Sequence, residues 1–359
     1  MPPPAATGVK PMRNPLSPAS LLEGASESGY VRSLMAGTVG VLALLGVSGL
    51  AFPDSVAGDL AGIVFSTSTA TSTARLAAPI VLAGLGGIFA EKSGVINIGL
   101  EGLLIISAFV SVYAASVVGV GNAVLGVPAL AIAFLAGIAA STFLSAVFAV
   151  VCIEFKADQI IAGLAVWLIA LGLAPFLSTV FFGGVNTPNL GVSVGWQYSA
   201  TMVVFATAGS WWLLNKTAFG KHLRAAGENP KALDTVGVSV SKVRYAGVLL
   251  SGVLSGVGGS ALALSIGQFV GSGETMVQGK GFIAIVAYLF GNYNPLGTLG
   301  AGALFAGLDA IQIRLQQLGY AIPDTLVQTI PYVVVIVVLT LVGRTQIPEA
   351  AGEHYETEE

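Results

Sequence analysis

Four polar side chains interrupt an apolar stretch between residues 91 and 102, and they are the first groups in the chain that could carry a function. Glu91, Lys92, Asn97 and Glu101 stand there among apolar residues and three glycines. Glycine allows tight or non-helical backbone. Within a membrane, such backbone occurs only where it is buried in protein or faces a water-filled cavity. The pattern predicts either that arrangement or a short cytoplasmic loop with solvated charges.

Two further side chains stand out because they lie inside apolar stretches. Asp309 is an acid within the stretch 296–313, and a carboxylate inside a membrane helix is a candidate functional group. A structural role near the outer interface is an equal alternative, and Arg314, five residues later, is not on the same helix face. Trp167 is more consistent with a core or lipid-facing position than with a platform for a ligand.

The sequence contains no phosphate-binding loop for nucleotide hydrolysis. The phosphate loop needs Gly-Lys followed by Ser or Thr, whose hydroxyl binds Mg²⁺. Here Gly220-Lys221 is followed by His222, and Gly279-Lys280 is followed by Gly281. We therefore expect any ATP hydrolysis to occur on another chain.

Metal and nucleophile chemistry are also unsupported. His222 and His354 are the two histidines, they lie far apart in polar regions, and Cys152 is the single cysteine. Imidazole or thiolate metal sites and histidine-based triads need more such groups. The sequence predicts no catalytic residue, no metal and no cofactor.

The composition identifies the class of protein. Charged residues make up 9% of the 359, apolar residues make up 55%, and the mean hydropathy is +0.86. Soluble domains carry about 25% charged residues. These values exclude a soluble enzyme, a nucleic-acid binder and a disordered scaffold. Because the apolar runs do not alternate as β-barrel strands do, we predict an all-α, polytopic helical membrane protein.

Long runs without a charged residue predict about ten transmembrane helices, because a crossing needs about 20 apolar residues. The predicted spans are 34–52, 74–90, 103–118, 127–150, 160–181, 199–215, 245–264, 281–291, 296–313 and 325–342. The second and the eighth are short, which predicts broken or re-entrant segments. The alternative is a tilted helix with Arg75 or Lys280 reaching the interface.

The distribution of lysine and arginine predicts the orientation, since cytoplasmic loops carry an excess of both. With ten spans and both termini in the cytoplasm, twelve of the fifteen fall inside. The twelve are Lys10, Arg13, Arg32, Lys92, Lys156, Lys216, Lys221, Arg224, Lys231, Lys242, Arg244 and Arg344. Residues 1–33 are predicted to be a disordered cytoplasmic segment, 34–345 the transmembrane domain, and 346–359 a solvated acidic tail.

The longest polar interruption, residues 216–244, contains the signals of a short helix. Asn229 is a favourable N-cap, Pro230 suits the first helical position, and Gly237 can end the helix in the left-handed conformation. These signals predict a two-turn helix from Pro230 to Val236 on the cytoplasmic face. Two turns are not stable alone in water, so the helix packs either on its own membrane domain or in a cytosolic partner.

Several motifs together resemble a known family. The segment Gly-Leu-Gly-Gly-Ile-Phe-Ala-Glu-Lys-Ser-Gly-Val-Ile-Asn-Ile-Gly-Leu-Glu-Gly (84–102) resembles a hallmark of permease subunits of ABC importers, in the nucleoside and simple-sugar branch related to the ribose and branched-chain amino-acid permeases. Residues 224–232 look like the coupling loop of that family. Residues 279–284 and 291–297 look like its downstream signature. The resemblance covers about 70–345.

The resemblance implies an importer that carries a nucleoside or simple sugar-like solute across the cytoplasmic (inner) membrane of a prokaryote. It implies three partners: a cytosolic ABC ATPase, a second permease subunit, identical or homologous, and an extracytoplasmic substrate-binding protein. The implied pathway residues are Asn97, Glu101, Gln159, Trp167 and Asp309. The residues expected to couple to the ATPase are Gly227, Glu228, Asn229, Pro230, Lys231, Asp234 and Gly237. The sequence departs from the family at Asp158, where Asn is expected, and at Trp167, where a polar residue is common.

The sequence leaves two alternative functions open and contains a sign of an internal repeat. An ion-coupled secondary transporter would need a membrane-embedded titratable cluster, for which Asp309 and Glu101 are the available acids. A membrane enzyme would need a catalytic cluster. Gly84-Leu-Gly-Gly87 and Gly256-Val-Gly-Gly259 hint at an inverted repeat, because the five helices that separate them reverse the direction of the chain.

Overall fold

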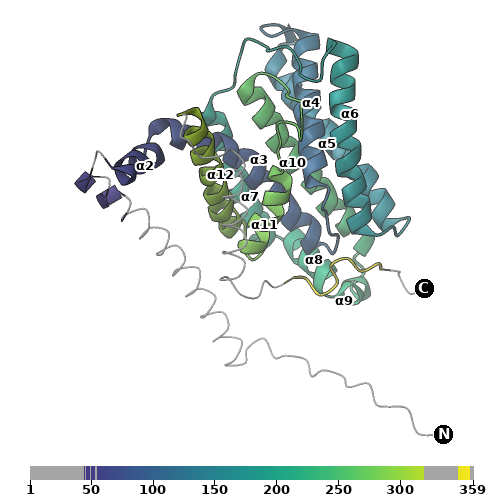
Figure 1. The fold of residues 1–359 in the computed structure, drawn as a ribbon. Helices are drawn as coiled ribbons and strands as arrows, with labels where there is room; N and C mark the ends of the chain where they lie inside the picture. The colour runs from purple at the N-terminus through teal and green to yellow at the C-terminus, as the bar shows by residue number, and fades with distance from the viewer. Residues whose placement is uncertain (1–43, 45, 49, 53–54, 319–346, 356–359) are drawn as a thin grey trace, which may run out of the picture. The chain divides into compact units, whose positions relative to one another are not determined.

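The computed structural model describes residues 44, 46–48, 50–52, 55–318 and 347–355 (Figure 1). The chain divides into two units, Met1–Val64 and Phe65–Glu359. The first unit contains helix α2, Val56–Val64. The second unit contains the rest of the described elements, and all of the features discussed below belong to it.

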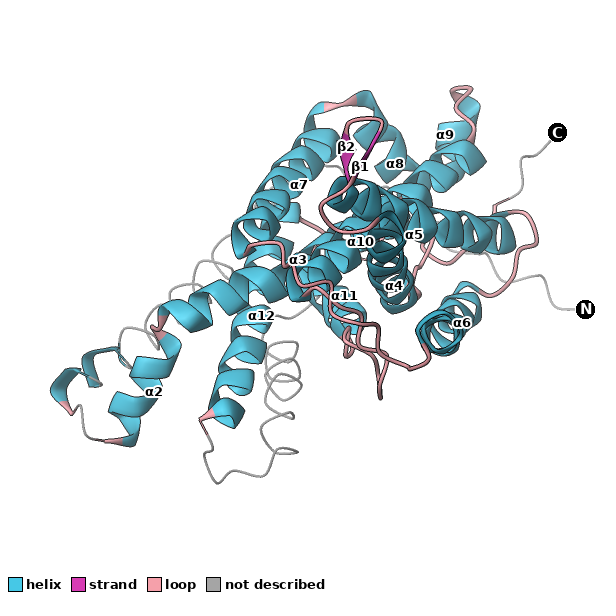
Figure 2. Cartoon of the chain, turned by 90° about the horizontal axis from the view of Figure 1, so that it is seen from above, coloured by secondary structure: helices cyan, strands magenta, loops and turns pink. Residues whose placement is uncertain are grey.

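The second unit is built almost entirely of helices (Figure 2). They are α3 Thr67–Lys92, α4 Leu100–Val118, α5 Ala129–Ile153, α6 Gln159–Phe182, α7 Trp196–Lys216, α8 Ala218–Glu228, α9 Pro230–Thr235, α10 Val240–Ile266, α11 Lys280–Phe290 and α12 Pro295–Gln317. The strands β1 Ala123–Val124 and β2 Val127–Pro128 form a two-stranded antiparallel hairpin between α4 and α5. The hairpin lies where the predicted spans 103–118 and 127–150 join, and a strand pair was not predicted there.

Among the described residues, six helices are long and apolar enough to cross a membrane: α3, α4, α5, α6, α10 and α12. The prediction of an all-α, polytopic membrane protein is therefore confirmed. Helices α7 and α11 coincide with the predicted spans 199–215 and 281–291 but are not among the six. The predicted span 325–342 lies outside the described residues, and 34–52 lies largely outside them.

The prediction that the second span is short, at 74–90, is wrong. Helix α3 has 26 residues and begins after Ser66, whose hydroxyl accepts a hydrogen bond from the backbone N–H of Thr69 at 3.1 Å. Within the helix, the hydroxyl of Thr73 donates to the carbonyl of Thr69 at 2.8 Å. Because local bonds of this kind satisfy hydroxyls inside a helix, the Ser/Thr-rich stretch continues the span instead of ending it.

Helices α3 and α10 lie at the centre of the unit and run antiparallel. A Cβ at Gly86 would lie 2.9 Å from the carbonyl oxygen of Ser251, and one at Gly258 would lie 3.1 Å from the Cα of Pro79. Glycine is required at such points because the two backbones are almost in contact. The antiparallel direction is the one that the predicted inverted repeat requires.

The outer helices show apolar side chains to their surroundings. Phe143 on α5, Phe176 on α6 and Phe205 on α7 are each more than half exposed, at 71%, 62% and 73%. A soluble protein would bury such side chains, whereas hydrocarbon accommodates them. The exposed apolar faces are consistent with a lipid surround.

Candidate functional site: the junction of two interrupted crossings

The first interrupted crossing contains the coil of residues 93–99, which turns back into the bundle against α10 and α6. Ser93 lies beside Gly247, where an added Cβ would approach its Oγ to 2.6 Å. One turn further along α10, the side-chain amide of Asn97 donates to Ser251 Oγ at 3.0 Å. Helix α4 therefore begins inside the protein, at Leu100.

The polar groups of this coil are buried and bonded within the chain. Asn97 and Glu101 are 1% and 2% exposed. The backbone N–H of Gly99 donates to Asn97 Oδ1 at 3.0 Å, and that of Ile96 donates to Gln159 Oε1 at 2.7 Å. The alternative of a cytoplasmic loop with solvated charges is therefore wrong, because the side chains satisfy buried backbone that water would otherwise have to reach.

The second interrupted crossing consists of residues 267–279 and helix α11. Helix α11 runs parallel to α3: Ala284 lies beside Gly84, and the ring of Tyr288 lies against Gly87. Its 11 residues span about 16 Å at 1.5 Å per residue, roughly half of the hydrocarbon thickness. The predicted short eighth segment is thus a short helix preceded by a coil.

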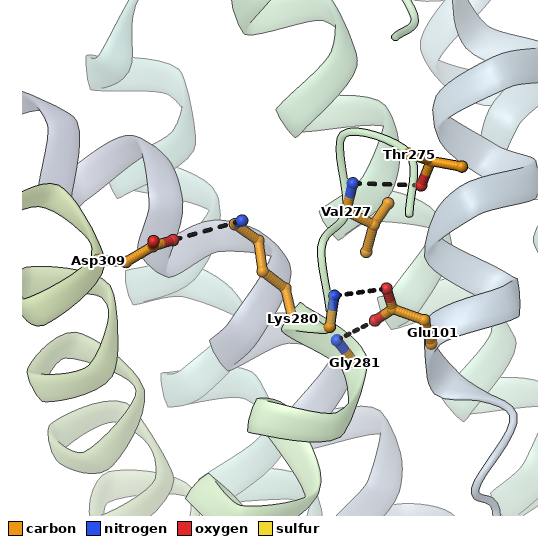
Figure 3. A network of polar contacts seen from close by, with 7 residues as sticks. Glu101, Thr275, Val277, Lys280, Gly281 and Asp309 are labelled. Carbon is orange, nitrogen blue, oxygen red and sulfur yellow. Dashed lines mark hydrogen bonds and ion pairs between the residues drawn. The ribbon is translucent and has the colours of Figure 1, made fainter. Parts of the chain in front are cut away.

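The two crossings meet at the carboxylate of Glu101, in the first turn of α4 (Figure 3). Its Oε1 accepts from the backbone N–H of Gly279 at 2.8 Å, and its Oε2 accepts from that of Gly281 at 2.6 Å. Helices α4 and α11 both begin here and run in opposite directions. Each helix start carries unpaired N–H groups and a partial positive charge, so one carboxylate stabilises both starts.

Lys280, the first residue of α11, forms an ion pair at the same junction. Its Nζ lies 3.3 Å from Asp309 Oδ2 on α12, and the two side chains are 3% and 16% exposed (Figure 3). A buried ammonium group is tolerated when an opposite charge neutralises it. Asp309 therefore lies within reach of the junction through Lys280, and Arg314 is not its partner.

Trp167 contacts the junction from α6. Its ring packs edge-to-face on Phe282 of α11, with the centroids 5.2 Å apart, and its backbone lies against Gly102. The structure thus brings Glu101, Trp167 and, through Lys280, Asp309 to the junction, and it places Asn97 and Gln159 on the coil 93–99 that leads into it. Each of them contacts other parts of the chain there.

Glu91 was noted in the sequence without a role, and the structure places it at the other end of α11. Its two carboxylate oxygens accept from the hydroxyls of Tyr288 and, at 2.5 Å, Tyr293. Lys92 lies over the Tyr293 ring, 5.6 Å from its centroid. Helix α11 is therefore bound at both ends by glutamates of the 91–102 segment. The separations of about 200 residues leave no local signal in the sequence.

The predicted coupling helix is present as α9, with the predicted start. Asn229 Oδ1 accepts from the N–H of Ala232 at 3.1 Å, Pro230 is the first residue, and Gly237 has φ of 79°. The helix ends at Thr235, one residue before the predicted Val236, because Val236 has already left the helical conformation. Leu233 is buried against the rest of the unit, so α9 packs on its own membrane domain.

An additional helix, α8, precedes α9 and was not predicted. Its last turn contains Gly227, where a Cβ would lie 2.5 Å from the carbonyl oxygen of Lys92 at the end of α3. The predicted coupling segment, residues 216–244, is therefore in close backbone contact with the segment that continues into the junction.

Residues 347–355 pack against both of these segments, in the region predicted to be a solvated acidic tail. The side chains of Glu349 and Glu353 are exposed, as expected, but Pro348 and Ala350 are buried. Figure 1 shows this segment, coloured yellow, beside α8 and α9. Within the described part of the chain, no group of three or more His, Cys, Asp or Glu side chains is arranged to hold a metal ion.

The chain is similar to known membrane permeases over most of its length. Residues 69–341 match the family model described as "Branched-chain amino acid transport system / permease component". The chain is 37% identical to the guanosine ABC transporter permease protein NupQ of Bacillus subtilis, over 79% of this chain and 95% of that protein. It is 36% identical to the nucleoside ABC transporter permease protein NupC of Lactococcus lactis, over 77% and 93%.

A third relative is named for another solute. The chain is 32% identical to the putative glucose ABC transporter permease protein of Haloferax volcanii, over 72% of this chain and 80% of that protein. No solved structure matches the chain.

Proposed function

Because the chain belongs to the permease-component family of branched-chain amino acid transport systems, we propose that it is the membrane-spanning subunit of an ABC importer for nucleosides or simple sugar-like solutes. The observation that carries the proposal is the similarity to a guanosine permease along nearly the whole length of that protein. Nucleosides are the first choice of solute, because two relatives are named for guanosine and nucleosides and one for glucose.

The charges at the junction suit a neutral solute. Glu101 binds two backbone N–H groups, and Lys280 pairs with Asp309. A helix start with free N–H groups attracts anions, but here a carboxylate of the protein already occupies that position. A nucleoside or a sugar, which carries no charge, would need hydrogen-bonding groups and aromatic surface instead. Asn97, Gln159 and Trp167 are side chains of those kinds near the junction.

The energy for transport would come from a separate cytosolic ABC ATPase. The importer would also contain a second permease subunit, identical or homologous, and an extracytoplasmic substrate-binding protein. The ATPase contacts proposed from the sequence are Gly227, Glu228, Asn229, Pro230, Lys231, Asp234 and Gly237. Glu228, Asn229 and Lys231 are exposed on α8 and α9, which favours their availability to a partner.

We further propose ten spans in the cytoplasmic (inner) membrane of a prokaryote, with both termini in the cytoplasm. Residues 34–345 would form the membrane domain, between a cytoplasmic segment at 1–33 and an acidic cytoplasmic end at 346–359. The six apolar helices, together with α7 and α11, account for eight of these ten segments.

The contacts suggest how ATP hydrolysis would move the pathway. A displacement of α8 and α9 would act on the end of α3 through the contact between Gly227 and Lys92. The coil 93–99 follows directly in the chain, and α11 is bound to the segment at both ends by Glu91 and Glu101. The junction would therefore shift as one connected group when the ATPase closes.

Uptake by purified protein in proteoliposomes tests the proposal. The permease is reconstituted with the ATPase and the binding protein, and the uptake of radiolabelled guanosine, uridine and glucose is measured with and without internal ATP. We expect ATP-dependent uptake of at least one nucleoside and none under an imposed ion gradient alone. Accumulation driven by the gradient without the ATPase would contradict the importer and favour a secondary transporter.

A further inference from the structure

Residues 347–355, here named the C-terminal strap, connect the coupling segment to the interior of the protein. The N–H of Ala350 donates to the carbonyl of Gly227 at 2.8 Å, in the last turn of α8. The N–H of Gly352 donates to the carbonyl of Gly94 at 3.1 Å, in the coil 93–99. One short segment is thus bonded to the two regions that transport must connect.

The strap also binds α9 and α10 through side chains. The hydroxyl of Tyr355 donates to Asp234 Oδ2 of α9 at 2.8 Å. Nη1 of Arg244, near the start of α10, donates to the carbonyl of Glu353 at 2.8 Å. Arg244 is 4% exposed, and a buried guanidinium needs bonded partners. The strap supplies one of them.

Helix α9 depends on contacts of this kind to keep its position. It has six residues, and a helix of that length is not stable without packing. Leu233 is buried beneath it, and Asp234, on the next position, receives the bond from Tyr355. Asp234 was expected from the sequence to present its charge to the ATPase. In the structure it is half-buried and is held by the strap.

We propose that the C-terminal strap transmits the movement of α9 to the coil 93–99, with Tyr355 as the positioning residue. This inference rests on the proposed function, because it assumes that an ATPase moves α9. When α9 moves, Asp234 displaces Tyr355, and the strap carries the displacement to Gly94 through the bond from Gly352. The coil then shifts Asn97 and Glu101, which lie at the junction.

The test is the number of solute molecules imported per ATP hydrolysed by the complete reconstituted importer. The variant Tyr355→Phe keeps the ring and removes the hydroxyl, so the strap remains packed while its bond to α9 is lost. We expect this coupling ratio to fall on the order of tenfold, the change that corresponds to a hydrogen bond to a charged acceptor. Assembly with the ATPase, measured by co-purification, should be unchanged.

Two further variants show whether the effect belongs to this bond. Asp234→Ala should lower the coupling ratio as Tyr355→Phe does, and the double variant should be no worse than either single variant, since both remove one interaction. His354→Ala changes the exposed neighbour of Tyr355 and should leave the ratio at the wild-type value.

Three results would overturn the inference, and they differ from failure of the proposed function. A wild-type ratio in Tyr355→Phe would mean that the strap does not transmit. Hydrolysis and uptake that rise together would mean that the strap inhibits. Additive losses in the double variant would mean that the two residues act separately. Failure of the proposed function would instead appear as absence of ATP-dependent uptake by the wild-type importer.

Discussion

The starts of α4 and α11 lie at the same junction but are stabilised in different ways. Helix α4 has an acid, Glu101, in its own first turn, which is the favourable sign of charge at a helix N-terminus. Helix α11 begins with Lys280, which has the unfavourable sign. Its start is compensated by Glu101 from α4 and by Asp309 from α12. Helix α4 is therefore locally stabilised, whereas the position of α11 depends on two other helices.

This difference indicates that α11 follows the other helices when they move. A helix that depends on partners follows when those partners move, and α11 is bound at its other end by Glu91 as well. The coil 93–99 and the start of α4 belong to the segment that supplies two of the partners, Glu91 and Glu101. The predictions below test this dependence.

The largest effect is expected from Glu101→Ala. The substitution leaves the N–H groups of the half-buried Gly279 and the buried Gly281 without a partner, and it removes the charge that both helix starts share. We expect a loss of about 3 kcal/mol or more in the free energy of unfolding, together with loss of uptake. Thermal melting of the detergent-purified protein measures it. The variant Glu101→Gln keeps one acceptor oxygen, so its melting temperature should lie between those of the wild type and Glu101→Ala. A wild-type melting temperature in Glu101→Ala would contradict the role assigned to the carboxylate.

A smaller loss is expected when the ion pair of α11 is broken. Lys280→Met leaves Asp309 without its partner, and Asp309→Asn leaves the buried ammonium of Lys280 uncompensated. We expect each to cost about 2–3 kcal/mol, less than a fully buried pair, because Asp309 is 16% exposed. The double variant should recover most of the loss in the same melting assay. Equal losses in all three would show that α11 does not depend on charge balance.

The bonds at the far end of α11 should contribute less to stability than those at its start, and their loss should lower uptake more than it lowers stability. Tyr288→Phe and Tyr293→Phe each remove one hydrogen bond to Glu91. We expect about 1–2 kcal/mol for each and a larger relative loss of uptake, because the end of α11 would no longer follow α3. Tyr245→Phe is a matched control, since its hydroxyl binds Glu154 outside this cluster. Wild-type uptake in both Tyr288→Phe and Tyr293→Phe would show that the hydrogen bonds to Glu91 are not needed for transport.

The smallest perturbation tests the proposed orientation of the protein in the membrane. On a Cys152→Ala background, Ser272→Cys places a thiol in the exposed part of 267–279, and Ser241→Cys places one at the coupling end of α10. In intact cells, an impermeant maleimide should label the first and leave the second unlabelled until the cells are opened. Both variants should transport normally. Labelling in the reverse order would invert the proposed orientation.

Local features of the fold could be predicted from the sequence. Charge-free runs predicted the long helices from α3 to α12. The start of α9 followed from Asn229 and Pro230, and its end, to within one residue, from Gly237, because capping depends on adjacent residues. The start of α3 could not be predicted from hydropathy, since Ser and Thr count as polar although their hydroxyls bond to the helix itself.

The candidate site could be predicted only as a set of residue types. The polar residues of 91–102 and Asp309 were recognisable because charges inside apolar sequence are costly. Their partners were not, since Glu101 and Gly281 are 180 residues apart and share no periodic pattern. The strap could not be predicted either, because its bonds to Gly227 and Gly94 use backbone groups, which every residue has.

The close approach of α3 and α10 has a mechanical consequence. Where Gly86 meets Ser251, the two nearest atoms to an added Cβ are backbone atoms, at 2.9 and 3.0 Å, and the nearest side-chain atom is the Ser251 hydroxyl, so little side chain is available to absorb a displacement. The two helices should therefore move as one rigid pair, relative to which the other helices rotate. The substitution Gly86→Ala would force the pair apart. When the other helices rotate relative to this pair, few side chains between α3 and α10 have to be ordered, so the entropic cost of the movement is small.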